Sequence, residues 1–195
     1  MPSLFRLGGV VASLVLIAFG IGSIAIGAIG RADVSDQLKQ ENITGSDDMT
    51  PGATAAAVQE AGLTDVVEVP TCSVAGERVD TGSEAKCFAE YMRVHALEAT
   101  GGKTYAEMPR FATADGQGTN DPAAAQKRPD SSPMDNPARA IWITETALST
   151  ALNTSFFAQQ VALFSIVMGI ALLLTGAGFL VLTLGLVRRG ARAAV

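Results

Sequence analysis

The sequence has very few of the side chains that usually carry chemistry. It contains one histidine, two cysteines and one tryptophan among 195 residues. A ferrous oxygenase site needs two histidines and a carboxylate, and a structural zinc site needs four ligands. The single histidine, His95, excludes the first site, and too few ligands remain for the second. No catalytic constellation and no haem, iron–sulfur or flavin ligand set is recognisable. We therefore expect a protein that is not an enzyme and that carries no cofactor and no metal.

Charge is missing from two long stretches of the chain. Leu7–Ile29 and Val161–Val187 contain no Asp, Glu, Lys, Arg or His. A hydrocarbon core of about 30 Å needs about 20 helical residues, and both stretches reach that length. They predict two transmembrane helices. Proton relays and ion pathways normally place an ionisable group inside the membrane, so transport by this chain alone is not expected.

The first apolar stretch has a second interpretation. An N-terminal apolar run is also typical of a cleaved signal peptide, and Ala28-Ile29-Gly30 or Gly30-Arg31-Ala32 offers small residues for cleavage. The apolar core of a signal peptide usually has about 7–15 residues. Leu7–Ile29 has 23 residues. This length favours a retained anchor, and cleavage stays open as the alternative.

The charges that are present are segregated along the chain. All 19 acidic residues lie between Asp33 and Glu145. Basic residues that flank transmembrane helices stay on the cytoplasmic side. We therefore expect a cell-membrane protein with residues 1–6 and 188–195 in the cytoplasm and residues 31–160 outside. An acidic exterior argues against nucleic acid as a partner. Outside residues 31–160, the charged side chains are Arg6, Arg188, Arg189 and Arg192.

Both cysteines lie in the segment that is expected outside. Cys72 and Cys87 are 15 positions apart. Oxidising compartments favour disulfides, so we expect these two residues to be bonded to each other. In the chain-entropy model, closing a loop of this size stabilises a fold by about 3 kcal/mol. Two free thiols, or half of a metal site, are the alternatives.

The exported segment, residues 31–136, predicts a small domain with helices and one strand. Residues 33–50 are polar and acidic and predict a juxtamembrane linker. An alanine-rich helix is expected over residues 53–61, because a proline precedes it and Gly62 follows it. The valine-rich residues 65–69 predict a short strand.

A second exported helix is expected after the first cysteine. Ser83 has the side chain of an N-cap, and Gly101 and Gly102 mark the end of the helix. Residues 111–137 contain four prolines and few apolar side chains, which predicts a flexible loop. One face of the helix is expected to pack on the helix over residues 53–61. That face collects Cys87, Phe88, Tyr91, Met92 and His95.

A continuous helix is expected from Pro137 to about Val187. Asn136 has the side chain of an N-cap, and residues 138–160 contain no proline and no glycine. The helix would include the second transmembrane stretch and project about 35 Å beyond the bilayer at 1.5 Å per residue. The predicted fold is thus mainly α and integral to the membrane. It has two transmembrane helices and a small disulfide-linked α(+β) domain packed on the long helix.

Small residues form a row on each transmembrane helix. Such residues let helix backbones approach closely in lipid. The two rows are expected either to pack on each other or to receive helices of another subunit. The first row is Gly9, Ser13, Gly20, Ser23, Gly27 and Gly30, and the second is Ala162, Ser165, Gly169 and Gly176.

The exported part of the long helix also offers a contact surface for a partner. Its large apolar side chains include Ile141, Trp142 and Leu148, and Trp142 is the only tryptophan of the chain. Tryptophan is enriched at interface hot spots. Packing inside the exported domain is the alternative role for Trp142.

Two segments carry a resemblance to known proteins: residues 91–105, read YMRVHALEATGGKTY, and residues 142–155, read WITETALSTALNTS. Over most of residues 7–187 the chain resembles small two-helix membrane proteins of actinobacteria. Such proteins are sometimes labelled aromatic ring-opening dioxygenases, and the single histidine contradicts that label. In size and topology the chain also resembles accessory subunits of actinobacterial cytochrome bcc–aa3 respiratory supercomplexes.

The resemblance implies a non-catalytic accessory or structural subunit. Its expected partners are the lipid bilayer and other membrane protein subunits, reached through the transmembrane helices and the long helix. The alternative is an envelope-side module that binds a small molecule or a protein and serves as a sensor or carrier partner.

Overall fold

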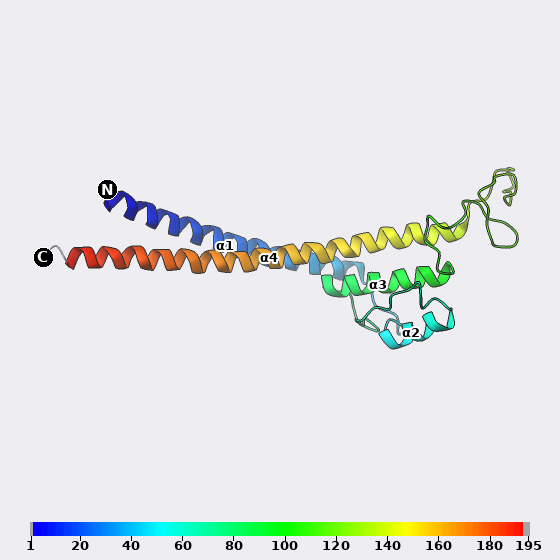
Figure 1. The fold of residues 1–195 in the computed structure, drawn as a ribbon, viewed down its shortest axis with the longest axis horizontal. Helices are drawn as coiled ribbons and strands as arrows, with labels where there is room; N and C mark the ends of the chain where they lie inside the picture. The colour runs from blue at the N-terminus through cyan, green and yellow to red at the C-terminus, as the bar shows by residue number, and fades with distance from the viewer. Residues whose placement is uncertain (1, 193–195) are drawn as a thin grey trace. The chain divides into compact units, whose positions relative to one another are not determined.

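The computed structural model describes residues 2–192 and the side chains of residues 4–185. The described chain contains four helices, and its mainly helical character confirms that part of the predicted fold class. By contacts it divides into two compact units. Unit 1 is Met1–Asp36 with Phe157–Val195, and unit 2 is Gln37–Phe156. The helices are α1 (Pro2–Glu41), α2 (Pro51–Glu60), α3 (Gly82–Ala99) and α4 (Pro137–Arg192) (Figure 1).

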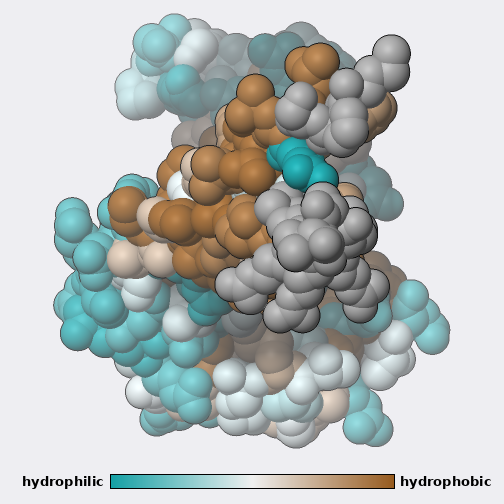
Figure 2. All heavy atoms as spheres, turned by 90° about the vertical axis from the view of Figure 1, so that its left-hand side faces the viewer, coloured by the Kyte–Doolittle hydropathy of each residue, from teal (hydrophilic) through white to brown (hydrophobic). Residues whose placement is uncertain are grey.

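Unit 1 is an antiparallel pair formed by the first part of α1 and the last part of α4. Both helices are long and apolar enough to cross a membrane. Figure 2 shows hydrophobic side chains gathered on the helices nearest the viewer. Large apolar side chains of both helices are exposed: Phe19 is 67% exposed and Leu174 is 70% exposed. The pair therefore presents an apolar outer surface.

α1 continues well past its apolar stretch, so the expected linker over residues 33–50 is wrong in its first part. Residues 31–41 contain no proline and no glycine to stop the helix. Leu38 is only 4% exposed and belongs to the core of unit 2. Burial of this leucine stabilises the extra turns, which is an example of tertiary packing overriding a polar local sequence. The helix ends before Asn42, which has a left-handed φ of 53°.

Unit 2 packs α2 against α3, as expected, but through Val94 and Leu97 and not through the expected face of α3. α2 begins after Thr50, whose hydroxyl accepts the Ala53 N–H at 3.2 Å. Val58 of α2 lies in one cluster with Val94 and Leu97 of α3. The helix that was predicted from the alanine-rich sequence is confirmed. Its buried side consists of small or β-branched residues, which allow the two helices to approach closely.

The beginning of α3 differs from the prediction. Thr81 is the N-cap, two residues before the expected Ser83. Its hydroxyl accepts the Glu84 N–H at 3.3 Å, while the Glu84 carboxylate accepts the Thr81 N–H at 2.8 Å. This reciprocal capping box satisfies two otherwise unpaired donors and contributes about 1 kcal/mol. Gly82, which is buried, tolerates the tight entry into the helix.

The described residues 2–192 contain no strand, so the expected strand over residues 65–69 and the β part of the fold class are wrong. Val66 and Val67 both donate their N–H groups to the Leu63 carbonyl, which makes a turn after α2. Val67 is 7% exposed and joins the cluster of Val58 and Val94. Valine favours strands only where a pleated partner is present. Here a single valine fills a gap between helices.

Residues 111–136 form a loop, as predicted, and the loop is held by its own backbone. Phe111 is 8% exposed and forms isolated bridges with Thr119 and Asp135. Its N–H donates to the Thr119 carbonyl, and the Thr119 N–H returns the bond, both at 2.9 Å. The prediction that this loop is flexible stays a prediction.

α4 confirms the expected long helix. The Asn136 side-chain oxygen accepts the Ala138 N–H at 3.1 Å, as an N-cap would. The helix runs for 56 residues, from Pro137 to Arg192. It thus contributes to both units. The side chains of the basic tail (residues 188–195) lie outside the part of the chain that the structure describes.

Candidate docking surfaces

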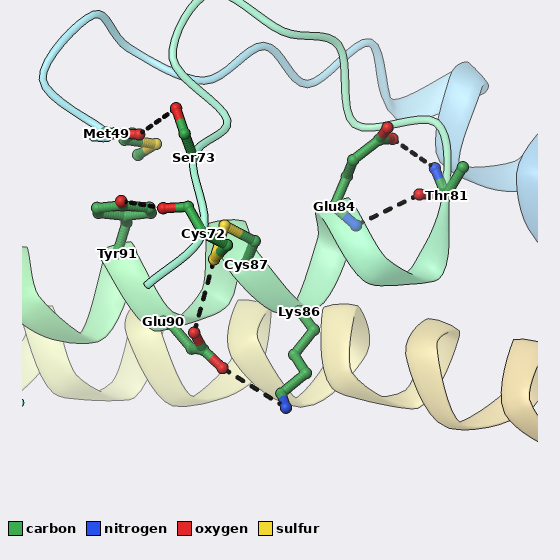
Figure 3. The surroundings of a disulfide bond; sticks show 9 residues. All are labelled: Met49, Cys72, Ser73, Thr81, Glu84, Lys86, Cys87, Glu90 and Tyr91. Atoms are coloured by element: carbon green, nitrogen blue, oxygen red, sulfur yellow. Dashed lines mark hydrogen bonds and ion pairs between the residues drawn. A yellow bond between two sulfur atoms is a disulfide. The ribbon is translucent and has the colours of Figure 1, made fainter. Parts of the chain in front are cut away.

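The expected disulfide between Cys72 and Cys87 is confirmed (Figure 3). It joins the segment after α2 to the second turn of α3. Tyr91, one turn further along α3, is fully buried and donates its hydroxyl to the Cys72 carbonyl at 2.5 Å. Burial raises the pKa of Tyr91, which keeps the phenol protonated and able to donate. The bond therefore sits within a packed cluster that Met49 and Val74 complete.

Backbone hydrogen bonds tie the segment after α1 to this disulfide loop. Val79 donates its N–H to the Ile43 carbonyl at 3.0 Å, and Gly45 donates to Glu77 at 2.9 Å. A Cβ on Gly45 would collide with the Val74 carbonyl, so only glycine permits this approach. The end of α1, the disulfide loop and α3 are therefore fixed to one another within unit 2.

The two small-residue rows face each other inside unit 1. A Cβ on Gly20 would lie 2.8 Å from the Gly169 carbonyl oxygen, and one on Gly176 would lie 3.0 Å from that of Ser13. Ser13 is fully buried and donates its hydroxyl to Gly9. The rows are therefore occupied by the packing of α1 on α4. Close pairs also join Gly9 with Thr183, Gly27 with Ala162 and Gly30 with Ala162, while Ser23 and Ser165 are half-buried.

Trp142 lies in the interior of unit 2. It is 3% exposed, and its indole Nε1–H donates to the Lys103 carbonyl at 2.8 Å. The Arg93 guanidinium lies 5.2 Å from the centre of its ring. The structure thus places this side chain in the core, where a partner does not reach it. Ile141 and Leu148, the other two expected contact residues, are 39% and 49% exposed.

Ile141 and Leu148 line a groove along α4 that was not predicted from the sequence. One cavity of about 810 Å³, here called the lower cavity, lies between the end of α1, α3 and α4. A second cavity of about 550 Å³, here called the upper cavity, lies between α3 and α4, and Met92 lines both cavities. We call the two together the α3–α4 groove. It is lined mainly by Leu38, Ile43, Phe88, Met92, Ile141, Glu145, Leu148 and Leu152.

One acidic side chain in the groove is buried. Glu145 is 6% exposed. Its carboxylate accepts hydrogen bonds from Ser149 at 2.9 Å and from Thr146 at 3.2 Å. Among residues 4–185, no lysine, arginine or histidine is paired with it. A buried carboxylate held by two hydroxyls alone leaves part of its desolvation cost uncompensated.

A second ionic feature lies at the upper end of the groove. His95 Nε2 lies 3.1 Å from Asp48 Oδ2. The hydroxyl of Ser46 hydrogen-bonds to Asp48 and lowers its pKa, and the neighbouring His95 lowers it further. Both side chains of the pair are well exposed, so the pair adds little stability.

No group of three His, Cys, Asp or Glu side chains converges as a metal site would require within the described chain. Comparisons with family models, curated proteins and solved structures found no match for this chain. The fold itself defines a class: a mainly helical, disulfide-bonded protein with two helices able to span a membrane.

The groove was predictable only in part. Ile141, Glu145, Leu148 and Leu152 recur at a spacing of three to four residues, so one wall of the groove is visible in the sequence. The other wall combines the end of α1 with Phe88 and Met92 of α3. These two residues were expected to pack on α2. They turn toward α4 because Val94 and Leu97 already fill the side of α3 that faces α2.

Proposed function

We propose that the chain is a non-catalytic accessory subunit of a larger membrane complex. Unit 1 is its membrane anchor, and unit 2 docks another subunit on the outer side. The observation that carries this proposal is the α3–α4 groove. It is an open, mainly apolar surface on a unit whose walls are fixed by a disulfide and by backbone hydrogen bonds. Exposed apolar surface of this kind is typical of an interaction site.

The outer surface of unit 1 supports the membrane location. Phe5, Phe19, Phe164 and Leu174 are each more than 60% exposed. Moving one such side chain from water into lipid is favourable by about 1.5–3 kcal/mol. The charged residues between each apolar stretch and its chain terminus are all arginines. We therefore assign both termini to the cytoplasm and unit 2 to the outside.

Thiol labelling tests this topology. Cysteines placed singly at Ser3 and at Ala193 are expected to resist a membrane-impermeant maleimide in intact cells. Ala124→Cys, in the exposed loop of unit 2, is expected to react. The native cysteines give no background because they are bonded to each other. Labelling at Ala193→Cys in intact cells would reverse the topology, and a mature N-terminus near Arg31 would replace the two-span anchor by one span.

The first complex to examine is the cytochrome bcc–aa3 respiratory supercomplex, because the resemblance in size and topology points to it. An envelope-side binding module for a small molecule is the second candidate function. The lower cavity supports it, since its volume of about 810 Å³ falls within the range of about 300–1,000 Å³ that is usual for ligand pockets.

Native co-purification separates the two functions. The tagged full chain, extracted from its own membranes in a mild detergent, is expected to carry other membrane subunits at a fixed stoichiometry that mass spectrometry measures. The stoichiometry should fall when Leu148→Glu is introduced and should persist in Ile143→Glu. A chain that purifies alone, and whose melting temperature rises with an added metabolite, would favour the binding module instead.

A further inference from the structure

We infer that the α3–α4 groove receives an amphipathic helix of a partner protein, and that a lysine or arginine of this helix pairs with Glu145. This inference rests on the proposed function and names the chemistry of the partner. Three observations carry it: the length of the groove along α4, the apolar floor, and the buried carboxylate that has no cationic partner within residues 4–185.

The shape of the groove suits a helix. Its α4 wall runs from Ile141 to Ser155, which corresponds to about 21 Å at 1.5 Å per residue. This is the length of about four helical turns. Phe88 and Met92 contribute the opposite wall from α3, also one turn apart. Grooves that take a helix accept anchors at i, i+3 or i+4, and i+7, and this floor presents side chains with the same period.

The floor is apolar and adaptable. Leu148 and Leu152 of α4 lie opposite Met92 of α3, and Leu148 is 49% exposed. Methionine has an unbranched, polarisable side chain that adjusts to different neighbours and is frequent at binding surfaces. Burying Leu148 and the half-buried Met92 under a partner removes apolar surface from water, which is the main source of affinity at such a site.

The charge of the groove selects a basic partner. Unit 2 carries 17 acidic and nine basic residues, a net charge of −8. Glu41 and Glu145 line the groove, and none of its described lining residues is a lysine or an arginine. A cation delivered to Glu145 would compensate a carboxylate that is already desolvated, so little further desolvation opposes the pairing.

The same charges argue against two other occupants. An anionic phospholipid would find no lysine or arginine for its phosphate among the described lining residues, and the histidine there, His95, already pairs with Asp48. A second copy of this chain would bring another acidic unit 2 to an acidic groove, and like charges disfavour that contact. The basic amphipathic helix is the occupant that satisfies both the floor and the carboxylate.

Designed peptides test the inference on the full chain. The chain is placed in phosphatidylcholine nanodiscs, and three fluorescent 15-residue helical peptides are added. They share a leucine face and carry only lysine, only glutamine or only glutamate on the polar face. Fluorescence anisotropy is expected to give a dissociation constant at least tenfold lower for the lysine peptide than for the glutamine peptide, with the glutamate peptide weakest. Empty nanodiscs measure the contribution of the lipid.

Substitutions locate the binding. Glu145→Gln is expected to remove most of the preference for lysine over glutamine, because the neutral amide keeps the shape and loses the charge. Leu148→Glu should weaken the lysine peptide about tenfold or more. Ile143→Glu lies five residues away on the same helix, outside the groove, and is 60% exposed. It adds the same charge and should leave binding unchanged.

Several outcomes would overturn the inference. Equal affinity for the lysine and glutamine peptides would remove the charge argument, and so would an undiminished lysine preference in Glu145→Gln. A phospholipid that stays bound in native mass spectrometry and is lost in Leu148→Glu would make the groove a lipid site. A dimer that dissociates in Leu148→Glu would make it a self-contact. The proposed function is tested separately, because co-purification of subunits that persists in Leu148→Glu leaves the accessory role intact and relocates the contact.

Discussion

Leucine in place of Gly20 is expected to separate α1 from α4 in unit 1. A Cβ on Gly20 would already lie 2.8 Å from the Gly169 carbonyl oxygen and 2.8 Å from Leu173 Cγ. Real Cβ atoms do not approach a backbone oxygen this closely, and the carbonyl cannot move without bending α4. Overpacking in a close-packed interface costs about 1–3 kcal/mol, and here the obstacle on one side is backbone. The helices should therefore splay.

A cysteine pair reports the separation. A Cβ on Gly30 would lie 3.5 Å from the Ala162 Cβ, which suits a disulfide. Gly30→Cys with Ala162→Cys is therefore expected to cross-link almost completely under mild oxidation in detergent micelles. Adding Gly20→Leu should reduce the cross-linked fraction several-fold, which a mobility shift after proteolysis within residues 111–136 measures.

The chain contains a matched control for this experiment. Gly22 lies on the same helix two residues away, and a Cβ there would meet nothing within 4 Å. Gly22→Leu adds the same side chain on the outer side of α1 and should leave the cross-link unchanged. Loss of the cross-link in Gly22→Leu, or its persistence in Gly20→Leu, would show that the two small-residue rows do not hold the pair together.

The helices were predicted best where the residues at the helix ends agree with the composition of the segment between them. Pro51 and Gly62 bracket α2, and Asn136 with Pro137 opens α4. In each case the residue types at the ends either satisfy or lack a backbone group that a helix leaves unpaired. Local chemistry was sufficient there because the ends of these helices are set by residues close in sequence.

The prediction failed where contacts between residues far apart in the sequence determine the local structure. α1 continues to Glu41 because Leu38 packs into unit 2, and residues 65–69 stay irregular because Val67 fills a helical core. Neither contact is visible from the local sequence. At the start of α3 the error was of another kind, since both Thr81 and Ser83 have capping side chains. Only Glu84 at the third position after Thr81 distinguishes them.

The candidate docking surfaces were also predicted only where the local sequence determines them. The small-residue rows were evident from spacing, but spacing does not say which helix each row meets. The α3–α4 groove needed three segments that are far apart in sequence: the end of α1, α3 and the start of α4. Glu145 was visible as a member of an amphipathic stripe. Its burial without a cationic partner among the described residues required the fold.

Removing the disulfide is expected to destabilise unit 2. Cys72 and Cys87 are 15 positions apart, and opening a loop of that size costs about 3 kcal/mol in the chain-entropy model. In the structure the bond also holds the Cys72 carbonyl against Tyr91, so its loss should loosen the buried hydroxyl contact as well. The double variant Cys72→Ala/Cys87→Ala avoids leaving an unpaired thiol.

Amide hydrogen exchange of the full chain in micelles measures this effect locally. Protection of the α3 amides is expected to fall about 100-fold, since about 3 kcal/mol corresponds to roughly two decades in an opening equilibrium. Protection of residues 161–180 should not change, because they belong to unit 1. Tyr91→Phe keeps the bond and the ring but removes one hydrogen bond, and it should cost only about 1 kcal/mol.

Three results would contradict this account of the disulfide. Alkylation of both thiols in the denatured, unreduced native protein would show that the bond does not form in the cell. Unchanged α3 protection in the double variant would show that the cluster of Met49, Val74 and Tyr91 holds α3 without it. A loss in Tyr91→Phe as large as that in the double variant would instead assign the stability to the buried hydroxyl. The ordering of the two losses therefore identifies which contact fixes the wall of the groove.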